Sequence, residues 1–362
     1  MSTATAPAVT STDAPVRRGR IRGIDLARGL ALAAMCTQHV FIEGPDGGTS
    51  TGWVAWLFRE SAGRASVVFF VLSGVSLALI TAGGSRSADP RALRRRGIAL
   101  VGVGLALAGT VWEASILQHY GVAFLVAPWL AGASRRALAA VTAAGLLGGP
   151  VALLAVPNLD DGVRGAADGT LVDPVVETAW DILAVGHYPM VLWIGFFTLG
   201  VLLGRLDLRH RAVVGRLVAG GAGVAVIAGL VVGLLGGPAA EGWRQLLATA
   251  GHSGMAGWTV QTGGIAVALI AAAIALPQAV TGRLGPLVAT GSMSLTAYLL
   301  HIVLVVGVFE FGIAPLGWSV GTQEASFFAL VGLMVLSCVG FVRWNPVGPA
   351  ERIMKRVATP SR

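Results

Sequence analysis

Long apolar stretches dominate this sequence and restrict what it can fold into. A hydrocarbon core about 30 Å thick takes about 20 apolar residues in helical form. Only 12% of the residues are charged and 55% are hydrophobic, whereas soluble domains are about 25% charged. The sequence therefore predicts an all-α, polytopic integral membrane helix bundle. Ten apolar stretches predict about ten transmembrane helices, at residues 24–42, 66–83, 97–112, 115–133, 137–156, 188–205, 214–236, 258–276, 288–310 and 324–342.

The basic residues predict the orientation of this bundle. If both termini are cytoplasmic, 22 of the 26 Lys and Arg residues lie in cytoplasmic segments. Only Arg59, Arg64, Arg164 and Arg244 then lie outside. This is the asymmetry of the positive-inside rule, and we expect a multi-pass protein of the inner cell membrane. The net charge of +8 has the same origin, so it indicates no nucleic-acid partner.

Domain boundaries follow from the same pattern. Residues 1–20 are predicted to be a disordered cytoplasmic tail, because residues 1–16 are small, polar and Pro-containing. Residues 21–345 form the predicted transmembrane domain, and 346–362 a cytoplasmic C-terminal tail. Arg17-Arg18 resembles a twin-arginine export signal. Charges at 25 and 28 interrupt the apolar run that follows, so we predict an uncleaved first helix.

Three ionisable residues stand in the first apolar stretch, "RGIDLARGLALAAMCTQHV". Asp25 and Arg28 are neighbours on one helical face, and His39 returns to that face after about three turns and about 16 Å of rise. Each buried charge costs roughly 2.5–3.5 kcal/mol at the bilayer centre. One interpretation is structural: an ion pair at the helix end and a hydrogen-bonded histidine. The alternative is that the three side chains line a functional cavity.

Further polar side chains at helix ends have two interpretations each. Gln118, His119 and Tyr120 begin the fourth stretch and could form an interfacial belt or the wall of a substrate site. Tyr298 and His301 are three residues apart and co-facial, so they suit interhelical hydrogen bonds or substrate contact. His187 precedes the sixth stretch and has the same two interpretations. The acidic segment 157–187 is either a solvated loop or a lid or acceptor-binding segment.

The remaining patterns exclude several kinds of site. No histidine stands at metal-ligand spacing with another His, Cys, Asp or Glu on a shared helical face, so no metal is expected. Cys36 and Cys338 indicate neither a disulfide framework nor a thiolate metal site. Glycine-rich runs lie inside apolar spans and lack a following Gly-Lys-Ser/Thr, which argues against a phosphate loop. His210 is expected to be solvated, and His252 carries little signal.

Several short blocks resemble known transmembrane acyltransferases. "IDLARGLALAAMCTQH" (24–39) is similar to their opening helix, with its aspartate, Arg-Gly pair and spaced histidine. "FFVLSG" (69–74) and "RALRRR" (91–96) resemble signatures of the acyltransferase-three family. Other blocks resemble the heparan-alpha-glucosaminide N-acetyltransferase-like and DUF1624/DUF418-type membrane proteins: "ILQHYGVAF" (116–124), "HYPMVLWIGFFTLGVLLGRLDL" (187–208), "GSMSLTAYLLH" (291–301) and "WNPVGPAERIMKR" (344–356).

This resemblance implies an acyl-CoA-dependent transmembrane O- or N-acyltransferase. Its donor would be cytosolic acetyl-CoA or another acyl-CoA, whose phosphates would contact basic residues of the "RALRRR" block, with Ser73 nearby. The acceptor would be a hydroxyl or amine of an extracytoplasmic glycan, glycolipid or small molecule. The lysosomal N-acetyltransferases carry a histidine in the loop after their first conserved helix. Here the loop 43–65 contains none, so the role of general base moves to His39.

The resemblance also assigns roles to the other polar residues. Asp25 and Arg28 would form a buried pair at the inner mouth of the site. The donor contacts would be Arg91, Arg94 and Arg95 with Ser73. The acceptor contacts would be Gln118, His119, Tyr120, His187, Tyr298 and His301.

Two other classes of function remain. A proton-coupled permease could use Asp25, Arg28 and His39 as a relay, and would need internal repeats or broken helices. A membrane scaffold fits the composition but leaves these three residues unexplained. The acceptor, the acyl chain length, an acyl-histidine intermediate and homo-oligomerisation are left open by the sequence.

Overall fold

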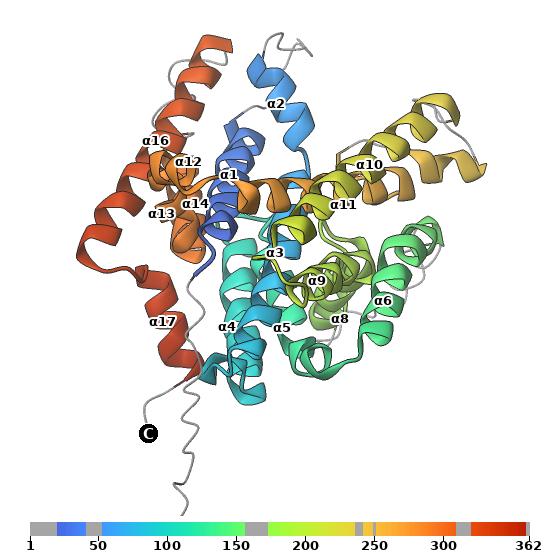
Figure 1. Ribbon diagram of the computed structural model, residues 1–362, viewed down its shortest axis with the longest axis horizontal. Helices are drawn as coiled ribbons and strands as arrows, with labels where there is room; N and C mark the ends of the chain where they lie inside the picture. Colours follow the sequence, from blue (N-terminus) through green and yellow to red (C-terminus); the bar gives the residue numbers. More distant parts are fainter. Residues whose placement is uncertain are drawn as a thin grey trace, which may run out of the picture.

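The computed structural model describes residues 20–40, 53–155, 173–235, 242–248, 251–308 and 320–359. Within these ranges every regular element is helical, which confirms the all-α fold class (Figure 1). The longer helices are α1 (Arg22–Val40), α3 (Arg64–Ala82), α4 (Pro90–Ala108), α5 (Leu117–Gly132), α9 (Met190–Gly204), α10 (Arg211–Leu235), α11 (Ala256–Ala275), α14 (Ser294–Val308) and α16 (Val320–Trp344). The shorter ones are α2 (Trp53–Ser61), α6 (Arg135–Ala143), α8 (Asp173–Trp180), α12 (Gln278–Arg283), α13 (Gly285–Ser292) and α17 (Pro349–Ala358).

Several helices are apolar on faces that no other helix covers. In the described residues, 5 helices are long and apolar enough to cross a membrane, or up to 7 if each of two bent pairs is one span. Only 6% of the most apolar stretch of α10 is buried inside the molecule. Its residue Leu234 is 82% exposed. Such a surface requires a lipid environment. The expected number of about ten spans and the cytoplasmic termini stay predictions, because α1, α4 and α5 are not among these seven.

Helix α1 lies at the centre of the bundle. It contacts α2, α3, α11, α13, α14 and α16, and Figure 1 shows it between α16 on one side and α3 on the other. The other extensive contacts join neighbours in sequence or in space: α4 with α5, α10 with α11, and α3 with α9. The polar residues of α1 therefore face protein on nearly every side.

Glycines allow the closest of these helix contacts. A Cβ atom on Gly291 of α13 would overlap the carbonyl oxygen of Asp25, and one on Gly29 would overlap that of Leu287. At the α3–α9 contact, Gly74 and Gly200 face backbone in the same way. Helices in lipid associate by van der Waals packing of small residues, because lipid is as apolar as their side chains. The Arg-Gly pair of α1 thus combines a charged side chain with a packing position.

A sharp break separates α13 from α14, and α17 covers it. The two helices are bent by 95° at this break. Glu351 of α17 accepts hydrogen bonds from the backbone nitrogens of Leu295 (2.7 Å) and Thr296 (3.2 Å), and from the Thr296 hydroxyl at 2.5 Å. At the N-terminus of α14, the carboxylate accepts hydrogen bonds from backbone N–H groups that have no partner within the helix. Its negative charge also interacts favourably with the positive end of the helix dipole. The C-terminal helix therefore stabilises the beginning of α14.

Candidate functional site

The Asp25 carboxylate binds two arginines near the beginning of α1. Arg20 donates from Nε (2.5 Å) and Nη2 (2.9 Å), and Arg28 donates from Nη1 at 3.0 Å. Arg28 also donates to the Ser76 hydroxyl of α3 at 2.5 Å. Asp25 is only 2% exposed, so these bonds offset its desolvation. The expected Asp25–Arg28 pair is present. Arg20, whose pKa is raised by its hydrogen bond to Asp25, is an additional partner that the sequence did not indicate.

His39 lies near the other end of α1, beside a second histidine. Its ring is 4.5 Å from the Trp112 ring and 5.3 Å from the His301 ring, centroid to centroid. His301 is fully buried, and its Nδ1 donates to the Tyr298 carbonyl oxygen. That bond leaves Nε2 as the unprotonated nitrogen of a neutral ring, and this atom has no hydrogen-bond partner among the described residues. The two histidines therefore include a buried, oriented and unoccupied proton acceptor.

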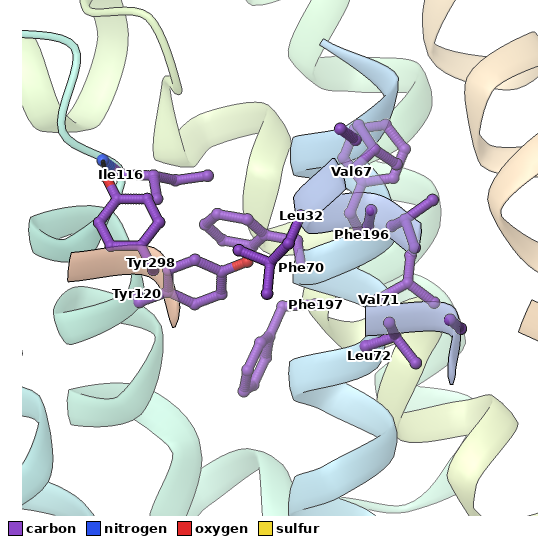
Figure 2. Packing of buried hydrophobic residues seen from close by; sticks show 14 of the residues in the cluster. Leu32, Val67, Phe70, Val71, Leu72, Ile116, Tyr120, Phe196, Phe197 and Tyr298 are labelled. Atoms are coloured by element: carbon purple, nitrogen blue, oxygen red, sulfur yellow. Dashed lines mark hydrogen bonds between the residues drawn. The ribbon is translucent and has the colours of Figure 1, made fainter. Parts of the chain in front are cut away.

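A small cavity of about 80 Å³ lies between α1, α3, α4, α5 and α14. Its polar lining includes Ser73, Arg96, Tyr120 and Tyr298. The Tyr298 hydroxyl accepts from the backbone nitrogen of Ile116 at 3.3 Å. Figure 2 shows Tyr298 pointing to Ile116 and the Tyr120 hydroxyl pointing toward Leu32 of α1. The Tyr120 ring stacks on Phe70 with a centroid separation of 4.4 Å.

A much larger cavity, of about 920 Å³, lies at the C-terminal end of α4. Residues at the beginnings of α5, α9 and α11 form much of its wall. Three histidines also line it: His119, His187 and His252. Two carboxylate residues, Glu113 and Asp181, also line it. Two other lining groups, Oε1 of Gln118 and Nε1 of Trp258, have no hydrogen-bond partner in the described ranges. Unpaired polar groups around a wide cavity indicate a ligand site.

Aromatic rings connect the histidines of the large cavity. The Tyr188 ring lies 5.4 Å from His119 and 5.7 Å from His252, centroid to centroid. Trp258 stacks on His252 at 6.4 Å. His252 is the one described non-glycine residue with positive φ, at 60°, a conformation that is uncommon but enriched for His. Its pKa is lowered because protein displaces water around the ring, and because His187 is close.

One segment, residues 112–120, separates the two cavities. Ser115, Gln118 and His119 line the large cavity, whereas Ile116, Leu117 and Tyr120 line the small one. Trp112, at the start of this segment, contacts His39. These nine consecutive residues therefore touch both cavities and the histidine pair.

The structure places eight of the predicted site residues at the two cavities or at the histidine pair. Gln118, His119 and His187 line the large cavity. Ser73, Tyr120 and Tyr298 line the small one. His39 of α1 and His301 of α14 contact each other, and the Trp112 ring lies beside both.

The predicted donor contacts on α4 lie apart from both cavities. Arg91, Arg94 and Arg95 are exposed, and the Arg94 guanidinium stacks over the Trp129 ring at 5.1 Å. The fourth arginine of the same run, Arg96, is the one that lines the small cavity. Nothing in the structure tests whether the exposed arginines bind a donor.

Two cavity residues lacked a recognised signal in the sequence. Arg96 stands four residues before the buried Leu100 and three after the buried Leu93, so the helical period places it on the buried face of α4. That spacing could have identified it. His252 lies in a Gly-containing loop without periodicity, and only the tertiary structure brings it to His119 and His187. In the ranges described, no group of three or more His, Cys, Asp or Glu side chains could hold a metal ion.

Comparison with known families identifies the kind of protein. A family model described as heparan-alpha-glucosaminide N-acetyltransferase, catalytic, matches residues 20–230, which is more than half of the chain. The chain belongs to this family. The match covers α1 to α9 and most of α10, and so includes the cavity-lining helices α3, α4, α5 and α9. A second model, a protein of unknown function (DUF418), matches residues 205–360. No curated protein matches the chain.

Proposed function

We propose that this protein is a membrane acyltransferase that moves an acetyl group from acetyl-CoA to a hydroxyl or amine. Membership in the N-acetyltransferase family supports the reaction class. The observation that carries the proposal is the segment 112–120, which forms a wall shared by a large and a small cavity. Transfer between two substrates requires two sites that meet at one place.

In this proposal the large cavity holds the acceptor. Its volume of about 920 Å³ suits a ligand of the size of one or two sugar rings, within the range of 300–1,000 Å³ that is usual for ligand sites. Trp193 and Trp258 supply aromatic faces, while Gln118, His119 and Glu113 supply hydrogen-bonding groups. The acceptor is thus a glycan-type compound that enters from the side of the membrane opposite to the tails.

The donor enters from the side where α17 and the beginning of α1 lie. Its thioester carbonyl reaches the region of Trp112 and His39. His39, as general base, removes the proton of the acceptor while the acceptor oxygen or nitrogen attacks the carbonyl carbon. The carbon–sulfur bond then breaks, and the coenzyme A thiolate leaves and takes up a proton. His301, with its free Nε2, is placed to exchange that proton with His39.

The decisive experiment measures transfer by purified protein. Labelled acetyl-CoA is incubated with the protein and an envelope extract as the source of acceptor, and labelled product and free thiol are counted. Substitution His39→Gln keeps size and polarity but cannot take up a proton near neutral pH. We expect turnover to fall 10²–10⁴-fold, as for loss of a general base, with coenzyme A affinity unchanged. Wild-type activity should also fall on the acid side as the base becomes protonated.

Two control variants separate catalysis from binding. His119→Gln should raise the KM for the acceptor more than it lowers turnover, because His119 lines the large cavity. His210→Gln, an exposed residue before α10, should behave as wild type. A folded His39→Gln protein that transfers at the wild-type rate would remove His39 from the mechanism. Wild-type protein that releases no thiol with any acceptor would refute the acyltransferase function.

The broken helices also favour a second candidate, a proton-coupled permease. Such transporters bind substrate at discontinuous helices, whose free N-termini attract anions. The break between α13 and α14 fits that pattern. However, Glu351 already occupies the N-terminus of α14, so this end is not free for a substrate. Uptake of a sugar into proteoliposomes without coenzyme A would support the permease, and thiol release without uptake would exclude it.

A further inference from the structure

A buried polar group of the small cavity has no partner. It is Nε of Arg96, which forms no hydrogen bond within the described residues. The hydroxyls of Tyr120 and Ser73 pair with each other and line the same cavity as Arg96. A buried donor without an acceptor costs about 1–3 kcal/mol, and more when it is charged. An unpaired guanidinium donor beside two hydroxyls at one cavity indicates a ligand that accepts hydrogen bonds.

The charges around this cavity do not balance. Arg96 forms no ion pair in the described ranges, and its guanidinium lies over the Phe124 ring at 4.5 Å. Glu351 and Arg28 act on it electrostatically, but Glu351 is bound to α14 instead. Arg28 shares its own carboxylate, Asp25, with Arg20. Positive charge is therefore in excess, and an unpaired charge inside a bundle is costly.

The size and lining of the cavity indicate the kind of anion. About 80 Å³ accommodates one compact group and not a whole nucleotide. Four hydroxyl-bearing residues, Ser73, Tyr120, Ser294 and Tyr298, line it together with the Arg96 guanidinium. A phosphate presents three or more oxygens to such donors, and arginine binds phosphate with its planar fork. A carboxylate has only two oxygens and would leave donors unpaired.

We propose that Arg96 and Tyr120, with Ser73, form a phosphate-binding site in the small cavity of the bundle. The phosphate belongs either to the coenzyme A part of the donor or to the headgroup of a membrane phospholipid. The first source rests on the proposed acyltransferase function, and the second does not. In both cases Arg96 supplies the charge, and the exposed arginines at 91, 94 and 95 are dispensable for this contact.

The test compares Arg96→Gln with Arg216→Gln, an exposed arginine of α10. The proteins are purified in a phosphate-free detergent and titrated calorimetrically with coenzyme A, 3′-dephospho-coenzyme A and pantetheine, which has no phosphate. Phospholipids that co-purify are measured by mass spectrometry. We expect Arg96→Gln to weaken one class of phosphate ligand at least tenfold, and Arg216→Gln to leave it unchanged. Tyr120→Phe should weaken the same ligand several-fold.

The pattern of losses identifies the source of the phosphate. Weaker coenzyme A binding with unchanged pantetheine binding assigns the site to the donor. Loss of a co-purified phospholipid with unchanged coenzyme A binding assigns it to a lipid. If Arg96→Gln binds coenzyme A and retains lipid as the wild type does, the proposal is wrong. If Arg96→Gln does not fold, the variants Arg96→Lys and Tyr120→Phe are tested in its place. If both of these variants bind all the ligands as the wild type does, the proposal is wrong.

This outcome is separable from the outcome for the acyltransferase reaction. A wild-type protein that binds phosphate ligands through Arg96 but transfers no acetyl group would refute the proposed function and keep the site. A protein that transfers acetyl groups equally well with Arg96→Gln, with unchanged ligand binding, would refute the site and keep the function.

Discussion

Asp25 shows how a single buried side chain controls the first helix. Its carboxylate is 2% exposed and binds both Arg20 and Arg28. Removing its charge leaves Arg28 in a low-dielectric setting without a counter-charge. Breaking a buried pair in this way typically costs about 3–5 kcal/mol.

We therefore predict that Asp25→Asn lowers the melting temperature of the detergent-purified protein and reduces activity as a consequence. The matched control is Glu60→Gln, which breaks the Glu60–Arg64 pair at 3.0 Å, where the carboxylate is 49% exposed. Pairs of that kind contribute about 0–1 kcal/mol, so this variant should melt almost as the wild type does. Equal melting temperatures for the two variants would contradict a structural role for the buried cluster.

At the scale of elements, the contact between α1 and α13 holds the carboxylate cluster in place. The backbones approach so closely that Gly291 lies against the carbonyl of Asp25, and Arg20 donates to the Ser292 carbonyl at 3.2 Å. Neither helix can move away without disturbing the arginines.

A methyl group at this contact should separate the helices. We predict that Gly291→Ala destabilises the protein by roughly 1–3 kcal/mol, as overpacking usually does. Gly102→Ala on α4 is the control, since an added Cβ there has nothing within 4 Å, and it should be neutral. Thermal melting in detergent measures both. A neutral Gly291→Ala would show that the helices can separate at no cost.

At the scale of the whole molecule, the polar groups are arranged between two ends of the bundle. The Asp25 cluster, Glu351 and the beginning of α4 lie at the end where α17 packs against α4, and Figure 1 shows α17 and the beginning of α4 together. The large cavity opens among the ends of α4, α5, α9 and α11 that lie away from α17. The proposed acetyl transfer requires the first end to face the cytoplasm.

The orientation is testable with single cysteines in a background without Cys36 and Cys338. From the 22-to-4 distribution of basic residues, we predict that cysteines at Ser87 and Ser361 react only with membrane-permeant reagents in intact cells. A cysteine at Gly169 should react with an impermeant reagent. Labelling of Ser87 from outside would invert the orientation and with it the assignment of donor and acceptor ends.

The sequence by itself determined the features that depend on local periodicity and composition. Apolar runs identify a helical membrane protein, because a helix satisfies the backbone hydrogen bonds of a segment that lies in lipid. The three-residue spacing identifies the Asp25–Arg28 pair, because residues one turn apart share a face. The "RALRRR" run identifies a basic helix end, although the three arginines we selected are exposed and the cavity residue is Arg96.

Only the tertiary structure decided which distant residues meet. The pairing of His39 with His301 joins residues 262 positions apart in the printed sequence, and no local pattern encodes such a contact. The same holds for His252 beside Tyr188 and for Glu351 at the beginning of α14, since each depends on how helices pack around α1. Cavities arise from what neighbouring helices leave unfilled, and a one-dimensional pattern contains no information about that space. The phosphate site proposed for Arg96 therefore depends on packing, whereas the membrane fold follows from composition.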